Sequence, residues 1–197
     1  MPNSTFLPPK GEYKKLVAFQ KSECIYDMTC YFIEHYLAPY GDRTVDQMKQ
    51  AARSGKQNIA EGNEAGTTSM ETNIKLMNVA KASLKELQED YEDYLRTHGM
   101  RIWSVQEPRC RAARDWCRTH NATTDYMKVC QTRDDETVAN VALIAIHQTD
   151  YLLYKLIEKL KEDFLQQGGI KEQMSAARRQ WREEHGMGWM NGYQGKK

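Results

Sequence analysis

The sequence predicts an all-α protein: an up-down four-helix bundle with a helical insertion between the third and fourth helices and a C-terminal helical suffix. Apolar residues recur three and four positions apart along four long segments, which is the period of a helix that is buried on one side. Turn-forming residues separate these segments. We expect the bundle over residues 10–169, with a basic insertion at 100–133, and the suffix and its tail at 170–197.

The first long helix is expected over residues 12–37, ending before the turn Pro39-Tyr40-Gly41. Residues 1–9, which precede it, lack the apolar core of a signal peptide and are expected to form a loose arm. The predicted buried stripe of the helix contains Leu16, Val17, Cys24, Met28, Phe32 and Tyr36.

The second helix, expected over residues 44–61 with Asp42 or Thr44 as its cap, contains a run of small residues. Ala52, Gly55 and Ile59 fall on one face of this helix. A glycine inside a helix costs about 1 kcal/mol relative to alanine, and close approach of a neighbouring helix would compensate for that cost. We therefore predict that a second helix packs directly against Gly55.

Two further residues of the run have expected roles. Asn58 lies three residues after Gly55, so its amide is expected to tie the two helices together. Gly62 is expected just beyond the end of the helix, where glycine is a common stop.

Caps and stops delimit the remaining helices. We expect a third helix from the capping box Thr68-Ser69-Met70-Glu71 to Thr97 with Gly99 as its stop, a helix from Pro108 to His120, a short helical turn over Asp125–Cys130, a fourth long helix from Asp134 to Gln167, and a last helix over Ile170–His185. The tail from Gly186, with Trp189 and Tyr193, is expected to be ordered only by a partner.

Charge, apolar runs and cysteine content limit the classes of function open to this chain. The 197 residues carry a net charge of +1, so no overall field demands an acidic partner. The insertion carries seven basic and three acidic residues and residues 170–197 carry six and three, so positive charge is concentrated in these two additions. No apolar run is long enough to span a membrane. Five cysteines without a framework spacing indicate reduced thiols in a cytoplasm.

Two short motifs indicate a family. Asn58-Ile59-Ala60-Glu61-Gly62, followed by Ala82-Ser83-Leu84-Lys85-Glu86-Leu87, resembles the motifs of the four-helix-bundle proteins encoded in intervening sequences of bacterial 23S ribosomal RNA genes. The resemblance covers about residues 12–99 and 134–167. It marks Gly55, Asn58, Ile59, Glu61, Gly62, Ser83 and Glu86 as structural motif residues.

The resemblance implies an up-down bundle that assembles into a homo-oligomer, a pentamer in this family. The family includes the accessory protein of diversity-generating retroelements, which binds nucleic acid and a reverse transcriptase, so RNA or DNA and a protein partner are implied as well. This chain differs by its insertion and by its suffix, and it is similar to the subgroup with a four-helix-bundle suffix domain. Its bundle is not basic, so contacts made by the accessory protein's bundle do not carry over.

The candidate nucleic-acid-binding residues are arginines of the two additions: Arg109, Arg111, Arg114, Arg118, Arg178, Arg179 and Arg182. Trp103 or Trp116 is available for base stacking, and Lys196 and Lys197 could add contacts. The alternative is that these arginines pair with acidic residues of the third and fourth helices, such as Glu89, Asp90, Glu92 and Asp93, in a purely structural assembly module.

We expect no enzymatic activity, no cofactor and no metal. Arg114 and His120 match a loose pattern of helical-bundle ribonucleases, in which arginine binds phosphate and histidine transfers a proton, but Arg178 and Arg179 before His185 fit it equally well. Cys110, Cys117, His120 and Cys130 are zinc-ligand types, yet Cys110 and Cys117 are two helical turns apart, about 10 Å along a helix. His147 and Asp150 are expected to be core or interface residues.

Overall fold

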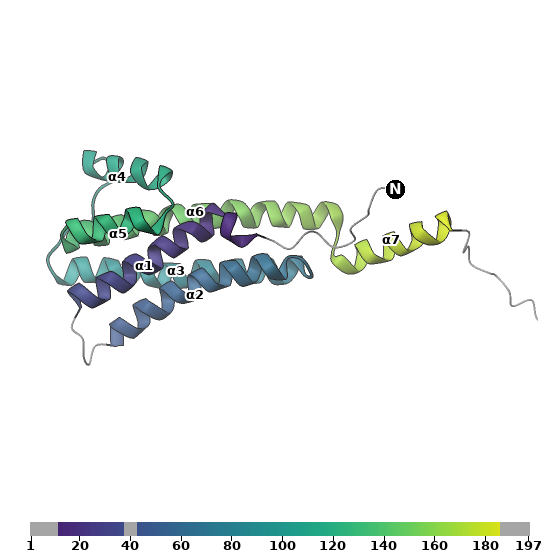
Figure 1. Ribbon diagram of the computed structural model, residues 1–197, viewed down its shortest axis with the longest axis horizontal. Helices are drawn as coiled ribbons and strands as arrows, with labels where there is room; N and C mark the ends of the chain where they lie inside the picture. Colours follow the sequence, from purple (N-terminus) through teal and green to yellow (C-terminus); the bar gives the residue numbers. More distant parts are fainter. Residues whose placement is uncertain (1–11, 38–42, 186–197) are drawn as a thin grey trace, which may run out of the picture.

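The computed structural model describes residues 12–37 and 43–185, and this part of the chain is helical with no β-strand (Figure 1). The prediction of an all-α protein is therefore confirmed. The expected arm at 1–9, the turn Pro39-Tyr40-Gly41, the cap Asp42 and the tail from Gly186, including Trp189, Tyr193, Lys196 and Lys197, lie outside the described residues.

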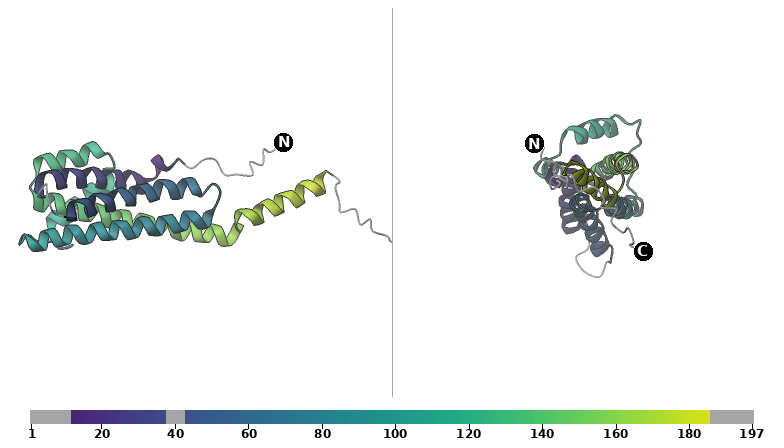
Figure 2. Two further views of the ribbon diagram at one scale, coloured as in Figure 1. Left: turned by 90° about the horizontal axis from the view of Figure 1, so that it is seen from below. Right: turned by 90° about the vertical axis from the view of Figure 1, so that its right-hand side faces the viewer.

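The helices follow one another with short connections. In chain order they are the 3₁₀ turn η1 (Tyr13–Lys15), α1 (Val17–Tyr36), α2 (Arg43–Ala65), α3 (Met70–Thr97), α4 (Pro108–Thr119), α5 (Thr123–Thr132), α6 (Asp135–Gln167) and α7 (Ile170–Glu184). Most ends agree with the sequence: Pro108 opens α4, Asp134 caps α6, and Gly99 follows α3 with a φ of 68°. In the left-hand view of Figure 2, α2 and α3 run along the length of the body and α7 extends beyond it.

The predicted end of α2 is wrong, because Gly62 lies inside the helix, which continues to Ala65. Of the two predicted caps, Thr44 is the second residue of the helix, and Asp42 lies outside the described residues. The reason at Gly62 is packing: a Cβ built there would lie 3.2 Å from both Leu76 Cβ and Met77 Cε of α3. Burial against α3 therefore outweighs the tendency of glycine to end a helix.

The start of α3 is shifted by one residue from the predicted capping box. Ser69 is the N-cap, and its hydroxyl accepts a hydrogen bond from the Thr72 amide at 3.2 Å. Thr68 instead donates to the carbonyl of Ala65 at 3.1 Å, and Glu71 pairs with Lys75 at 2.7 Å. Ser69 therefore caps the helix with its side chain, but Glu71 does not form the return bond of a capping box in the described residues.

Four long helices enclose the core. α1 packs against α2 and α6, and α3 packs against the same two helices, while α5 lies on α1 and α4 lies on α6. The largest fully buried side chains come from α1, α2, α3, α5 and α6: Ile25, Met28, Phe32, Met48, Ile59, Met77, Leu84, Leu87, Tyr91, Leu95, Tyr126 and Ile146. Phe32 is central, with its ring 5.0 Å from that of Tyr91 and 4.7 Å from that of Tyr94.

The predicted close contact at Gly55 is confirmed. Ala52 and Gly55 are buried, and a Cβ built on Gly55 would lie 2.9 Å from Cδ2 of Leu84 in α3. Ile59, on the same face, is completely buried. The missing side chain at residue 55 thus leaves room for Leu84 of α3 to pack directly on α2.

Asn58 connects the helices indirectly. Its amide nitrogen donates to the carbonyl and the hydroxyl of Ser54 in its own helix, at 2.8 and 3.1 Å. The Ser54 hydroxyl in turn bonds the Ser83 hydroxyl of α3 at 2.8 Å. The expected tie between the helices exists, but the two serines form it. Glu61 and Glu86, the acidic motif residues, are exposed.

Within the described ranges, no helix combines the length and the apolar character that crossing a membrane requires.

Candidate functional site

The insertion docks on the protein's own body through a buried lysine. Lys21 of α1 is 2% exposed, and its ammonium donates to the carbonyl of Cys117 and approaches the carbonyl of His120 and the hydroxyl of Tyr126, both at 3.5 Å. Those two carbonyls belong to the C-terminal end of α4, which attracts positive charge. Burial lowers the pKa of Lys21. The lysine thus joins α1, α4 and α5 at one point.

Polar contacts hold the outer side of the insertion against α6. The Asn140 side chain accepts from the Trp103 amide at 2.8 Å and donates to the carbonyl of Arg101 at 2.9 Å. Further along α6, the Gln148 side chain donates to the carbonyl of Arg114 at 2.8 Å. α4 therefore has a fixed position, and side chains on its outer face are presented by a rigid support.

Arg109 does not belong to a free surface. Its guanidinium pairs with Glu107 at 2.8 Å and with Glu136 of α6 at 3.1 Å, and it lies over the Trp103 ring, 4.7 Å from the centroid. This pairing with an acid of the fourth long helix is the kind that the structural alternative predicts. Arg109 is used to fix the insertion.

The other three arginines of α4 project outward. Arg111, Arg114 and Arg118 are all exposed. Among the described residues Arg118 pairs only with Asp115, one turn away at 3.3 Å, and both side chains are largely in water, so this pair is worth little. Arg111 and Arg114 form no ion pair or side-chain hydrogen bond with any other described residue. Their charges are free for a ligand.

The arginines of α7 stand on a separate helix. Arg178 and Arg179 are exposed and Arg182 is half-buried, and none of the three pairs with an acid in the described part of the chain. α7 extends away from the other helices (Figure 2, left), so the α7 and α4 arginines do not form one surface. The arginines of α4 and those of α7, which the sequence analysis treats as one set of candidates, therefore lie on separate surfaces.

The acidic residues of α3 remain unpaired with these arginines. Glu86, Glu89, Asp90 and Asp93 crowd together, and burial together with this repulsion raises the pKa of Asp90 to about 6. Asp93 pairs with Arg96 of its own helix at 2.7 Å, and Glu92 accepts from Gln88. The predicted arginine pairs with the acids at 89, 90, 92 and 93 are absent from the described residues.

We expect Asp90→Asn to stabilise the protein at pH 7 by about 1 kcal/mol, a value reduced for solvent screening. Because the pKa is raised on folding, the folded state holds this proton more tightly, and stability falls as pH rises from about 4 through 6. The gain should therefore vanish near pH 4. Urea unfolding at both pH values checks this, with Glu61→Gln, an exposed acid on α2, as the control. Equal gains at both pH values would contradict it.

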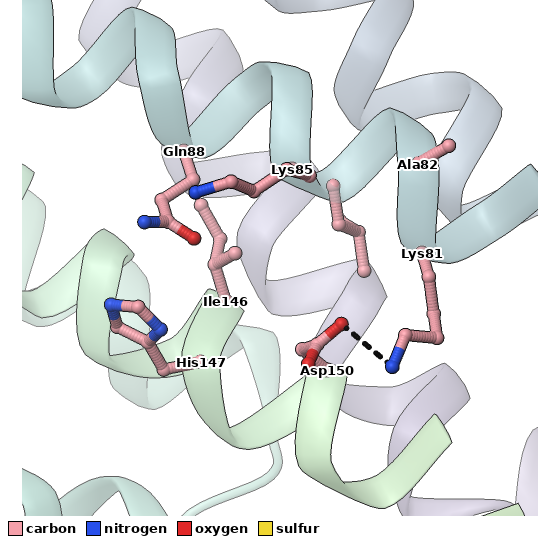
Figure 3. A pocket seen from close by; sticks show the side chains of 8 residues that line it. Lys81, Ala82, Lys85, Gln88, Ile146, His147 and Asp150 are labelled. Carbon is pink, nitrogen blue, oxygen red and sulfur yellow. Dashed lines mark ion pairs between the residues drawn. The ribbon is translucent and has the colours of Figure 1, made fainter. Parts of the chain in front are cut away.

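A groove of about 510 Å³ runs between α3 and α6 (Figure 3). Leu84 and Ile146 line it together with Lys81, Lys85, His147 and Asp150. Lys81 is neutralised by Asp150 at 3.2 Å, while Lys85 and His147 are exposed and have no partner among the described side chains. The groove therefore offers weak positive charge over an apolar floor.

Four of the five histidines have the same structural role. Each follows an aromatic residue by four positions at the C-terminal end of a helix, stacks on that ring and places Nδ1 against its carbonyl oxygen. The pairs are Tyr31 with His35, Tyr94 with His98, Trp116 with His120, and Trp181 with His185. A histidine in this position can hydrogen-bond a terminal carbonyl that has no partner within the helix. Its interaction with the negative C-terminal end of the helix dipole is also favourable.

The structure does not bring together Arg114 and His120, the two residues of the ribonuclease pattern. His120 Nδ1 is 2.9 Å from the Trp116 carbonyl, and the Arg114 carbonyl, not its guanidinium, faces α6. Six residues along a helix place two side chains about 120° apart in direction. Arg114 and His120 therefore do not converge on a common phosphate.

Neither do the thiols converge on a metal. Among the described residues no group of three or more histidine, cysteine or acidic side chains is placed to hold an ion. Cys110, Cys117 and Cys130 are free and buried, and burial raises the pKa of Cys130 to about 11. They pack as small apolar residues.

The anchoring residues were not identified from the sequence. Lys21 occupies a core position between Val17 and Cys24 of the α1 stripe, and a charge at such a position indicates a buried partner. Asn140 interrupts the apolar run of α6 in the same way. No protein-family model, curated protein or solved structure matches the chain. The exposed arginines, the projecting helix and the groove are the features from which a function can be inferred.

Proposed function

We propose that this is a non-catalytic protein that binds nucleic acid, RNA or DNA, through the outer face of α4. The observation that carries the proposal is the pair Arg111 and Arg114, which are exposed and unpaired among the described residues and lie on a helix held in place by Lys21, Asn140 and Gln148. Arginines on a rigid support can contact phosphates without first being ordered. Arg118 extends the same face by one turn.

The proposed architecture is an up-down four-helix bundle made of α1, α2, α3 and α6, with residues 100–133 as an insertion and 170–197 as a suffix. The pairwise packing of these four helices and the Gly55 contact support it. We further propose kinship with the 23S rRNA intervening-sequence proteins. This kinship implies a bacterial, cytoplasmic homo-oligomer, a pentamer in that family, with a protein partner of the reverse-transcriptase type. Its support is the motif pair around Asn58 and Ser83.

We expect single-stranded and double-stranded oligonucleotides to bind at low salt and to lose affinity steeply as salt rises. Replacing Arg111 and Arg114 by glutamine should lower the slope of log Kd against log salt by about two, because each phosphate contact contributes roughly one. Fluorescence anisotropy measures this. Arg53→Gln, an exposed arginine on α2, is the matched control. Absence of binding at low salt would end the proposal, and an unchanged slope would remove α4 from it.

The second candidate is a structural assembly module, favoured by the exposed apolar residues of α7, Met174 and Trp181. In this alternative the basic suffix contacts a neighbouring subunit and not a phosphate. The two functions are compatible if α4 binds nucleic acid and α7 mediates assembly.

A further inference from the structure

Two exposed tyrosines lie on the outer surface of α6, directly after the part of this helix that α4 covers. Gln148, which donates to the carbonyl of Arg114, marks the edge of the covered part. Tyr151 follows Gln148 by three residues, on the next turn of the same side of the helix, and is 59% exposed. Tyr154, one turn further on, is 47% exposed. The two rings therefore begin where the contact with the arginine-bearing helix ends.

The ring partners that the described residues give these tyrosines are lysines. The ammonium of Lys155 lies 5.8 Å from the ring centroid of Tyr151 and 6.0 Å from that of Tyr154. The ammonium of Lys81, from α3, lies 5.5 Å from the centroid of Tyr154. Contacts between an exposed ammonium and a ring are weak. A flat aromatic group can therefore replace the lysine on the ring, which leaves the ammonium free for an anion next to it.

The charges around the two tyrosines leave positive charge in excess. The neighbouring acids are already paired with lysines: Asp150 with Lys81 at 3.2 Å, and Glu158 with Lys161 at 3.0 Å. Lys85 and Lys155 are exposed and form no ion pair with a described residue. Their two charges suit phosphates, which Lys binds as a point charge.

The groove between α3 and α6 belongs to the same surface, because Lys81 lines the groove and also lies over the Tyr154 ring (Figure 3). Lys85 of α3 and His147 of α6 line the two sides of this groove, above the apolar side chains of Leu84 and Ile146. Its volume of about 510 Å³ lies within the usual range of ligand clefts. The groove thus adds an apolar bed, with cations at its sides, to the two exposed rings.

We propose that this surface binds a single strand of nucleic acid and continues the path that starts on α4. We call it the tyrosine surface, and it consists of Lys81, Lys85, His147, Tyr151, Tyr154 and Lys155. The rings of Tyr151 and Tyr154, about 4.5 Å apart along the helix axis, stack on two successive bases, while Lys85 and Lys155 contact the phosphates.

The chemistry of the tyrosine surface favours a single strand over a duplex. A duplex keeps its bases stacked on one another, so their faces cannot reach the tyrosine rings, whereas the bases of a single strand can turn outward. Ring faces and phosphates are common to RNA and DNA, so we expect both to bind. The inference rests on the proposed nucleic-acid binding and names the form of the ligand.

Paired substitutions of the two tyrosines in the full chain test the stacking. Tyr151→Ala together with Tyr154→Ala should weaken the binding of oligothymidylate and oligouridylate by at least about tenfold and leave the affinity for a duplex of the same length unchanged. Phenylalanine at both positions keeps the ring faces and should restore most of the lost affinity. Fluorescence anisotropy at a fixed salt concentration measures each affinity, and circular dichroism confirms that the variants remain helical.

Substitutions of the two lysines test the phosphate contacts. Lys85→Gln together with Lys155→Gln should lower the slope of log Kd against log salt for a single strand by about 1.4, because each phosphate contact contributes roughly 0.7. Lys49→Gln, which changes an exposed lysine of α2, is the control and should leave the slope as it is in the wild type.

The outcomes separate this inference from the proposed function. Full affinity in the alanine pair, together with weakened binding when Arg111 and Arg114 are replaced, would overturn the tyrosine surface and leave α4 as the binding face. An equal loss for single strand and duplex, or no rescue by phenylalanine, would overturn the stacking. Reduced self-association of the alanine pair with unchanged affinity would assign the surface to a second copy instead. Absence of binding to every oligonucleotide at low salt would overturn both proposals.

Discussion

Replacing Lys21 by alanine is expected to lower the free energy of unfolding by about 3 kcal/mol and to release the insertion. The substitution removes the ammonium from the buried carbonyl of Cys117 and leaves the His120 carbonyl with the Tyr126 hydroxyl as its side-chain donor at 3.2 Å. It also empties the space of the lysine stem. Denaturant unfolding measures the loss. Amide hydrogen exchange should show faster exchange at the end of α4 and in α5 than in α2.

Lys21→Met separates the charge from the volume. It keeps most of the lysine stem and removes the cost of burying an ammonium. The lowered pKa of Lys21 reflects that cost, because burial disfavours the charged form. We therefore expect a smaller loss than for alanine, about 1 to 2 kcal/mol, because the Cys117 carbonyl loses the ammonium while the Tyr126 hydroxyl still donates to the His120 carbonyl at 3.2 Å. Unchanged stability and unchanged exchange in Lys21→Ala would mean that the packing of α5 on α1 and the contacts with α6 hold the insertion without the lysine.

A loss of similar size is expected at Gly55. Gly55→Val should cost about 3 kcal/mol, since even one added carbon would lie 2.9 Å from Leu84 Cδ2 and 3.0 Å from its Cγ, and Leu84 is completely buried. Gly55→Ala should also destabilise, because the clash exceeds the gain of about 1 kcal/mol in helix propensity.

A double-mutant cycle makes this prediction specific to the contact. Leu84→Ala alone should cost about 3 kcal/mol, as for a large core residue. In that background the obstacle is gone, so Gly55→Ala should become stabilising by up to about 1 kcal/mol. Urea unfolding of the four proteins gives the coupling. Additive effects would contradict a direct contact between residue 55 of α2 and Leu84 of α3.

The helices were predictable because each carries its own period and its own end signals. Pro108, Asp134 and Gly99 act within a few residues, and the structure uses them as the sequence indicates. Gly62 was misplaced because the property that decides its position, burial against Leu76 and Met77, depends on another helix. Gly55 was interpretable for the opposite reason, since a glycine amid helix formers already implies a close neighbour.

The candidate site was only partly accessible to sequence reasoning. The positive charge of the insertion is visible in composition, but composition cannot separate Arg109, paired with Glu136, from Arg111 and Arg114, which are free. The decisive contacts join positions far apart in the chain, such as Gln148 with residue 114. A lysine in an apolar stripe was the available clue to the docking point, but its partners lie 96 or more residues further along the chain.

The separation between Lys21 and Cys117, 96 residues, has a consequence for synthesis on the ribosome. α1 emerges first, yet both the carbonyls that receive its ammonium and its neighbour α6 emerge much later. During that interval the hydrated charge of Lys21 lies in the middle of the exposed apolar face of α1, which disfavours aggregation with other chains. The ammonium that bonds the insertion in the folded protein is thus expected to keep the incomplete polypeptide from aggregating.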